Sequence, residues 1–336
     1  MYTYLVKKIL VLGCNSFSGS SFISMLSEKQ FKIYGVSRSN INNKFNRFYK
    51  NKKKISFKKI DISKDLEKII KYINKIKPTY IINFISESMV GESWKYPEDW
   101  YYLNSYILPT FYHKISDYKF IKKVIHFSTP EVYGSTKKNI LENFNFQPST
   151  PYGVSRVTAD QTCQILFKHK KFPVIITRAS NVYGEYQKLY RIIPKTIFAI
   201  LNNKKIPLDG GGKSIRNFIH IDDVSKALIK IIYKGTVGQT YHISSSEFIS
   251  IRTLIEKISK KWNKKLNDVC IISKERLGKD HTYYLSSKKL KKIGWFSTIS
   301  LDMGINRVTQ WIDENFQTLK KEKIYYEHKK NIKQRP

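Results

Sequence analysis

A tyrosine and an arginine four residues apart have the chemistry for proton transfer. Tyr152 and Arg156 open a predicted helix, and residues four apart lie on the same face of a helix. A phenol has an ordinary pKa of about 10, so it needs a neighbouring cation to ionise readily near neutrality. Glu131, which follows a predicted strand, adds a carboxylate. These residue types indicate acid–base chemistry on a substrate.

A glycine-containing turn near the N-terminus has the features of a phosphate-binding loop. Residues 13–19, with the sequence GCNSFSG, follow a predicted strand and precede a predicted helix, which is the context of a dinucleotide-binding loop. The helix N-terminus supplies N–H groups and a positive dipole end to a pyrophosphate. Ser16 replaces the middle glycine, so a purely structural strand-to-helix turn is the alternative. The predicted cofactor-binding residues here are Gly13, Asn15, Ser16, Phe17 and Gly19.

The residues after the second and third predicted strands bear on which dinucleotide is bound. NAD-binding proteins usually place an acidic residue after the second strand, but this chain has Ser37 and Arg38. Arginine can hold a phosphate with two hydrogen bonds, whereas an acid would repel it. We therefore predict NADP as the preferred cofactor, with NAD possible, and the alternative is that Arg38 is one more surface cation. Asp61, just after the third predicted strand, is placed to reach the adenine of the cofactor. Ile62, the next residue, is also predicted to bind the cofactor.

Alternating β-rich and amphipathic segments must position these residues. The alternation is the signature of a parallel sheet flanked by helices, so the sequence predicts an α/β fold with a doubly wound parallel sheet of the Rossmann type. After about Asn181 the alternation of strands and helices becomes less regular. Proline, glycine and polar residues interrupt the chain more often there, which predicts a smaller substrate lobe. Predicted strands lie at 8–12, 32–36, 55–59, 80–84, 123–127 and 174–177, and predicted helices at 17–28, 66–76, 99–118 and 151–170.

Composition narrows the class of protein. An apolar fraction of 41% and an aromatic fraction of 14% are those of a packed globular chain. The net charge of +35 comes from lysines scattered along all 336 residues rather than gathered in one stripe, so nucleic-acid binding is not expected. No apolar run approaches the length of a membrane span, and Cys14, Cys163 and Cys270 lack metal-ligand spacing. We expect a soluble, cytoplasmic protein without a metal site, ending in a solvated basic tail at residues 319–336.

Three segments together resemble the extended short-chain dehydrogenase/reductase superfamily. They are STPEVYG at 128–134, YGVSR at 152–156 and RASNVYG at 178–184. Within that superfamily the chain is most similar to the sugar-nucleotide 4,6-dehydratases, which include the dTDP-glucose and GDP-mannose enzymes, from about Lys8 to Trp311. The resemblance implies conversion of a nucleoside-diphosphate hexose to its 4-keto-6-deoxy form. Hydride leaves C4, water is lost across C5 and C6, and hydride returns to C6.

The resemblance also implies catalytic roles. Tyr152 would take the proton from the 4-hydroxyl, and Thr129 would hydrogen-bond that hydroxyl. Arg156 stands where the family has lysine, so it would hold the cofactor ribose and keep Tyr152 readily ionised. Glu131 would remove the C5 proton. Pro130 replaces the aspartate that protonates the leaving hydroxyl in the dTDP-glucose enzymes, which leaves another donor, a water or Glu131 itself as alternatives.

Substrate contacts and assembly follow from the same resemblance. The implied substrate-binding residues are Ser88 and Ser93, which would line the nicotinamide and sugar, and Asn181, Arg191, Arg216 and Arg276, which would contact the diphosphate or nucleoside of a GDP- or dTDP-hexose. A homodimer would form through the helices at 99–118 and 151–170. The predicted dinucleotide-binding domain comprises residues 1–180, with 216–245 returning to it, and the nucleotide-sugar-binding lobe comprises 181–215 and 246–318.

Other functions are still compatible with the sequence. A UDP-glucuronate decarboxylase also has a glutamate after the fifth strand, and a sugar 4-epimerase shares much of the site. A catalytically inactive NADP-binding protein is the alternative from another class, because Ser16, Pro130 and Arg156 all depart from the family pattern.

Overall fold

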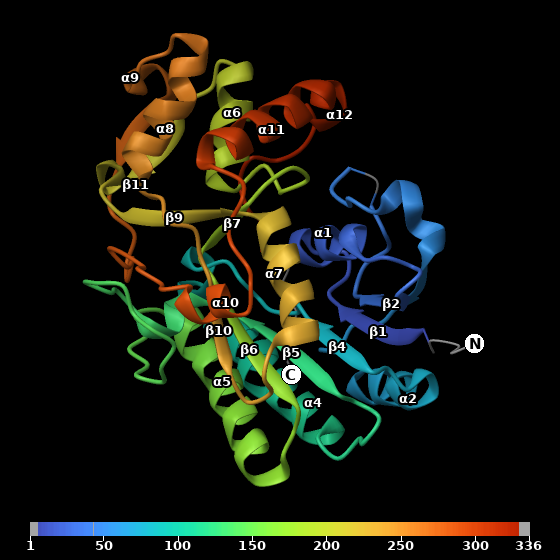
Figure 1. Ribbon diagram of the computed structural model, residues 1–336. Coiled ribbons are helices and arrows are strands. Elements are labelled where there is room, and N and C mark those ends of the chain that lie inside the picture. The colour runs from blue at the N-terminus through green and yellow to red at the C-terminus, as the bar shows by residue number, and fades with distance from the viewer. Residues whose placement is uncertain (1–5, 43, 329–336) are drawn as a thin grey trace, which may run out of the picture.

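The computed structural model describes residues 6–42 and 44–328 (Figure 1). Within these ranges, seven strands form one parallel sheet in the order β10-β6-β5-β4-β1-β2-β3. The six predicted strands all lie in it with ends shifted by two residues at most, and the predicted doubly wound α/β fold is confirmed. The strands are β1 (Lys7–Leu12), β2 (Phe31–Ser37), β3 (Ile55–Lys59), β4 (Tyr80–Asn83), β5 (Lys123–Ser128), β6 (Val174–Ala179) and β10 (Thr240–Ile243).

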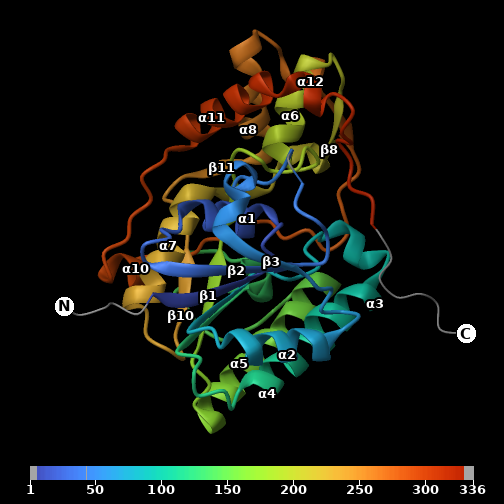
Figure 2. The ribbon, with the colours of Figure 1, turned by 90° about the vertical axis from the view of Figure 1, so that its right-hand side faces the viewer.

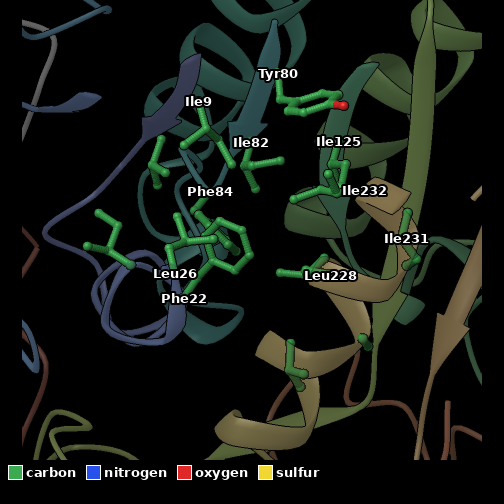
Figure 3. Packing of buried hydrophobic residues seen from close by; sticks show 14 of the residues in the cluster. Ile9, Phe22, Leu26, Tyr80, Ile82, Phe84, Ile125, Leu228, Ile231 and Ile232 are labelled. Atoms are coloured by element: carbon green, nitrogen blue, oxygen red, sulfur yellow. The ribbon is translucent and has the colours of Figure 1, made fainter. Parts of the chain in front are cut away.

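Helices cover both faces of this sheet (Figure 2). Because side chains alternate along a strand, Ile9 of β1 joins the core under α1 and α7, whereas Leu10 joins the core under α2, α4 and α5. Figure 3 shows the first of these cores, where Phe22 of α1 and Leu228 of α7 pack on the face that carries Ile9. The helices are α1 (Phe17–Met25), α2 (Leu66–Ile76), α4 (Leu108–Ile115), α5 (Pro151–Lys170) and α7 (Ile221–Lys234).

Two of the predicted helices differ in detail. The first ends at Met25 rather than Glu28, because Leu26 is already extended. The helix predicted at 99–118 is composed of α3 (Pro97–Trp100), a π-helical stretch (Tyr101–Ile107) and α4. Pro109 has no amide hydrogen to donate one turn back, which is a physical reason for irregular winding before α4.

The second lobe has its own core. A three-stranded sheet has the order β11-β9-β7, and β8 pairs in parallel with β12. Residues such as Ile197, Leu254 and Ile305 pack the lobe's helices together. The elements are β7 (Asn181–Tyr183), β8 (Ile206–Asp209), β9 (Ile215–His220), β11 (Phe248–Ser250), β12 (Cys270–Ser273), α6 (Ile192–Leu201), α8 (Ile251–Ser259), α9 (Leu266–Val269), α11 (Leu301–Glu314) and α12 (Phe316–Leu319), while α10 (Lys288–Lys292) packs near β10.

The segment 216–245 divides between the two lobes. The prediction returned all of it to the large domain, but β9 pairs with β7 and β11 of the small sheet. Helix α7 and strand β10 do lie in the large domain, where α7 packs against α1. Short 3-10 helical turns occur at Tyr49–Lys54, Gly91–Trp94, Pro130–Tyr133, Gly210–Gly212 and Lys260–Trp262.

The C-terminal segment is a correction to the sequence prediction. Residues 320–328 were expected to be solvated, yet they run from α12 along the molecule to α3 (Figure 2). The rest of the predicted tail, residues 329–336, lies outside the described ranges. None of the described helices combines the length and apolar character that a membrane crossing requires.

Candidate active site

A cleft of about 690 Å³ lies between the two lobes. The carboxyl-terminal ends of the parallel strands border it, through Phe84 after β4, Ser128 of β5 and Ala179 of β6. A cavity of about 240 Å³ adjoins the cleft, and the two share Asn15, Ser16, Arg38, Phe84, Ser86 and Glu87 in their walls. Ligands of open α/β sheets bind at this edge, so the two cavities form one candidate site for a long ligand.

The loop at 13–19 has the shape that a dinucleotide needs. Gly13 has φ of +74°, and a Cβ on Gly19 would lie 2.3 Å from the Gly13 carbonyl oxygen, so both positions require glycine. Ser16, in place of the middle glycine, is the N-cap of α1, and its hydroxyl accepts a hydrogen bond of 3.0 Å from the Gly19 amide. Asn15, Ser16 and Phe17 line the cleft at the start of α1. The loop therefore fits a pyrophosphate.

The remaining predicted cofactor residues surround the smaller cavity. Ser37, Arg38, Asp61 and Ile62 all line it, together with Gly13. The Asp61 carboxylate is held by the backbone amide and hydroxyl of Ser63, at 3.1 and 2.7 Å. This cavity is suited to the adenosine half of a dinucleotide.

Arg38 has an acidic partner that sequence reasoning missed. Its guanidinium lies 3.0 Å from the Glu87 carboxylate, and the arginine side chain is 51% exposed against 5% for the glutamate. Both residues border both cavities. The ion pair therefore marks the junction between the adenosine end and the rest of the cleft.

Thr129, Glu131 and Tyr152 meet at the floor of the cleft. Strand β5 ends in a 3-10 turn whose N-cap is Thr129, and the Thr129 hydroxyl accepts from the Glu131 amide at 3.3 Å. Helix α5 begins beside this turn, since a Cβ on Gly153 would lie 2.9 Å from the Glu131 carbonyl oxygen. Thr150 caps α5 through the Gly153 amide, which places Tyr152 in the first helical turn.

The Glu131 side chain is partly buried, and one of its two carboxylate oxygens is shielded from solvent. Its Oε2 atom has no hydrogen-bond partner among the described residues. Burial, followed by the nearby Asp280 carboxylate, raises the pKa of Glu131 to about 7, against the opposing pull of Arg216, Arg276 and Arg191. A group with this pKa is a competent base and, once protonated, a competent acid near neutrality.

Burial and Arg156 act in opposite directions on the pKa of Tyr152. Burial raises the pKa of Tyr152, and Arg156 is the largest of the influences that lower it. The cation thus acts in the expected direction, but burial outweighs it. Arg156 itself is 1% exposed and does not line the cleft, and its Nη2 atom donates to the Phe127 carbonyl at 2.6 Å. Its contact with a cofactor ribose stays a prediction.

A buried polar layer lies behind α5. Asp160 of α5 accepts hydrogen bonds from Arg178 of β6 at 3.1 and 2.7 Å, and it lies 3.2 Å from His126 Nε2 of β5. Although burial works to raise the pKa of Asp160, Arg178 and His126 hold it below its ordinary value. This layer ties α5 to two strands and so fixes where Tyr152 lies. Sequence reasoning missed it, because nothing in the spacing of these three residues links them.

Five of the six predicted substrate-binding residues line the cleft. They are Ser88, Asn181, Arg191, Arg216 and Arg276. The sixth, Ser93, does not line the cleft: its side chain is fully buried, and its hydroxyl donates to the Val90 carbonyl at 2.7 Å. A short polar side chain in a loop often satisfies nearby backbone in this way.

The arginines of the cleft differ in how their donors are used. Arg216 donates to the carbonyl oxygens of Ile215, Asp280 and His281, so much of its guanidinium is committed to the protein. Arg276 pairs with Asp209 at 2.7 Å while half exposed, and Arg191 makes a long contact of 3.4 Å with the Ser88 hydroxyl. Arg191 and Arg276 are therefore the better placed of the three to bind a diphosphate.

Fold and site together define a class, that of dinucleotide-dependent enzymes that act on nucleotide-sugars. Residues 10–308 match the family described as GDP-mannose 4,6 dehydratase. The chain belongs to this family, and with it to the nicotinamide-dependent hydro-lyases that dehydrate the sugars of nucleotide-sugars.

Relatives of known function agree with this assignment. The human dTDP-D-glucose 4,6-dehydratase is 31% identical over 256 residues, which cover 71% of this chain and 70% of the human protein. A trifunctional UDP-glucose 4,6-dehydratase, epimerase and reductase of Arabidopsis thaliana is 28% identical over 94% of this chain. The chain spans about half of that plant protein, at 48% of its length.

Solved structures show the same fold. The dTDP-glucose 4,6-dehydratase of Bacillus anthracis in complex with NAD aligns with a TM-score of 0.82 at 28% identity, over 93% of this chain and 98% of that one. The dTDP-glucose 4,6-dehydratase of Streptomyces venezuelae aligns at 0.85 with 24% identity, over 93% and 98%. A UDP-glucuronic acid 4-epimerase of Bacillus cereus aligns at 0.82 with 23% identity, over 91% and 99%.

Proposed function

We propose that this protein converts a nucleoside-diphosphate hexose to the 4-keto-6-deoxyhexose. The observation that carries the proposal is the Glu131 carboxyl, whose Oε2 atom is buried beside Tyr152 without a partner among the described residues. An unpartnered buried carboxyl is costly to keep unless function requires it. A base at this place is what elimination across C5 and C6 needs.

The residues divide the proton transfers between them. A nicotinamide bound in the cleft would supply the hydride acceptor and donor. Thr129 orients the 4-hydroxyl, and Tyr152 takes its proton with the Arg156 cation favouring the phenolate. The ketone then acidifies C5–H, and Glu131 removes that proton.

The leaving 6-hydroxyl also needs a proton. Pro130 has none to give, although it occupies the position of an acid in the dTDP-glucose enzymes. Glu131 carries a proton once it has deprotonated C5, and with a pKa of about 7 it can release that proton to the departing oxygen. We propose that Glu131 serves both steps, and that a proton from solvent reaches C5 when hydride returns to C6.

We further propose NADP as the preferred cofactor. Support comes from Ser37 and Arg38 in the wall of the adenosine cavity, and from the half-exposed guanidinium of Arg38. Replacing Arg38 with Asp should shift affinity towards NAD, as measured by titration with both dinucleotides. Equal preference for NAD in both proteins would contradict the assignment.

The substrate, assembly and location complete the proposal. Arg191 and Arg276 would bind the diphosphate of a GDP- or dTDP-hexose. A homodimer would use the exposed apolar side chains of α3 to α5, among them Tyr106 and Ile165, which are 60% and 59% exposed. The three cysteines are free thiols buried in the fold, which supports a reducing, cytoplasmic setting.

The deciding experiment is incubation with a panel of GDP-, dTDP- and UDP-hexoses and UDP-glucuronate, with NADP⁺ or NAD⁺, followed by chromatography and mass spectrometry. Loss of one water from one of these substrates is the expected result. A 4-epimerase would give a product of unchanged mass, and a UDP-glucuronate decarboxylase would release carbon dioxide. An inactive binding protein would change none of them.

A further inference from the structure

The last described segment of the chain, residues 320–328, has an alternating pattern. Glu322, Ile324, Tyr326 and His328 are partly buried, whereas Lys321, Lys323, Tyr325 and Glu327 are exposed. Alternation of this kind is typical of a chain that lies across a surface with one side facing in. We call residues 320–328 the strap.

The strap is attached to the protein at both ends. Near its start, Glu322 pairs with Lys44 at 2.8 Å, and Ile324 packs on the core of the small lobe. At its end, the His328 ring lies 5.1 Å from that of Tyr96 and 4.9 Å from that of Trp100. His328 Nε2 is 2.6 Å from Asp99 Oδ2, and both side chains are 2% exposed. The strap therefore connects the small lobe to α3 of the large domain (Figure 2).

Tyr326, in the middle of the strap, forms part of the cleft wall. Its ring meets that of Tyr190 edge-on at 5.2 Å. Burial raises the pKa of Tyr326, and the Glu87 carboxylate raises it further while Arg38 and Arg191 oppose. The Tyr326 hydroxyl lies 3.3 Å from His328 Nδ1, and Tyr326 borders the same cleft as the Arg38–Glu87 pair. Tyr325, its neighbour, is 53% exposed and does not line the cleft, although its ring contacts the side chain of Lys195, which does.

We propose that the strap closes over the bound dinucleotide, with Tyr326 in contact with the cofactor and His328 as the anchor that keeps the strap in place. This inference rests on the dinucleotide site proposed above. A reaction that takes a hydride from C4 and returns it to C6 regenerates its cofactor in each cycle. Such an enzyme gains nothing from releasing the cofactor, and a strap anchored on both lobes slows that release.

The test compares two adjacent tyrosines. NADP⁺ and NAD⁺ affinity and dissociation rate are measured by calorimetry and stopped-flow fluorescence for the wild type, Tyr326→Ala, Tyr325→Ala and His328→Ala. Loss of an aromatic contact should weaken the preferred dinucleotide by about five- to tenfold in Tyr326→Ala. His328→Ala should accelerate dissociation, and Tyr325→Ala should match the wild type. Equal values for Tyr326→Ala and Tyr325→Ala overturn the strap proposal.

A second measurement on the wild type guards against misfolded variants. Lys321 and Lys323 are exposed in the strap, so trypsin cleavage after them reports how firmly the strap is held. The bound dinucleotide should slow that cleavage, and cleavage at the same rate with and without it overturns the proposal. If the wild type binds neither dinucleotide, the cofactor proposal fails with it, whereas equal affinities in wild type and Tyr326→Ala overturn the strap alone.

Discussion

Two carboxyl groups, one on α5 and one on the 3-10 turn beside the start of α5, differ in their partners. Asp160, in the middle of α5, accepts two hydrogen bonds from Arg178 and lies beside His126. Glu131, on the cleft side, leaves Oε2 without a partner among the described residues. Their pKa values accordingly move in opposite directions, down for Asp160 and up to about 7 for Glu131. Arg178 and His126 outweigh the effect of burial on the pKa of Asp160, whereas burial is the largest influence on the pKa of Glu131. This difference separates a structural carboxyl from one that can transfer protons.

Replacing Glu131 with Gln should have the largest effect on activity. The amide keeps the shape of the side chain and removes its basicity, and general-base catalysis typically contributes about 10²–10⁴-fold. Turnover should fall by that factor while the free energy of unfolding stays equal or rises, because a carboxyl whose ionised form is disfavoured by desolvation is gone. Steady-state kinetics and urea denaturation measure the two. A large loss of stability would place Glu131 among the structural residues with Asp160.

Replacing Asp160 with Asn should have the largest effect on stability. The change leaves the Arg178 charge buried and unpaired, which typically costs about 3–5 kcal/mol. Asp117→Asn is the control, because Asp117 pairs with Lys170 at the surface with 70% of its side chain exposed, and such pairs contribute about 0–1 kcal/mol. Similar unfolding free energies for the two variants would show that the polar layer does not hold α5.

Substitution of Arg156 should have an intermediate effect. Arg156→Met removes the largest influence that lowers the pKa of Tyr152. The alkaline limb of the pH–rate profile should therefore move to higher pH. Each unit by which the pKa of Tyr152 rises corresponds to about a tenfold smaller ionised fraction. Arg156→Lys keeps the charge and should retain most activity. If the wild type, Arg156→Met and Arg156→Lys gave the same pH–rate profile, Tyr152 would not need the Arg156 cation.

The smallest expected effect is a shift in the acidic limb of the pH profile of kcat/KM. Glu131 must be ionised to remove a proton, so kcat/KM should rise with pH through about 7. The pKa of Glu131 is raised from 4.5 in the unfolded chain to about 7 in the folded protein. The protonated carboxyl therefore stabilises the fold fully below pH 4.5, and this contribution is lost as the pH rises through about 7. Asp280→Asn removes a nearby negative charge and should move the acidic limb to lower pH. An unchanged or raised limb would exclude Asp280 as a cause.

The fold and the cleft floor were accessible from the sequence for a physical reason. Buried parallel strands are continuous apolar runs, and the residues at their carboxyl ends necessarily meet at one edge. Thr129, Glu131 and Tyr152 therefore line one cleft as expected, while their catalytic roles stay predictions.

What could not be predicted depends on contacts between distant segments. The burial of Arg156 and of Ser93, and the pairing of Asp160 with Arg178, follow from how α5 and the loop after β4 pack. The docked strap was mistaken for a solvated tail because its charge density hides the alternation that brings Tyr326 and His328 inward. Composition reports average exposure, whereas docking depends on a few side chains.

The central claim, that Glu131 carries the C5 proton, is tested most directly by running the reaction in deuterated water and locating deuterium in the product. The wild type should place deuterium at C5. Glu131→Gln, supplied with the same nucleotide-hexose, should accumulate near-ultraviolet absorbance of reduced nicotinamide while forming little 4-keto-6-deoxy product, because C4 oxidation still proceeds and deprotonation does not. Deuterium at C5 and dehydration at the wild-type rate in Glu131→Gln would contradict the account and place the base elsewhere.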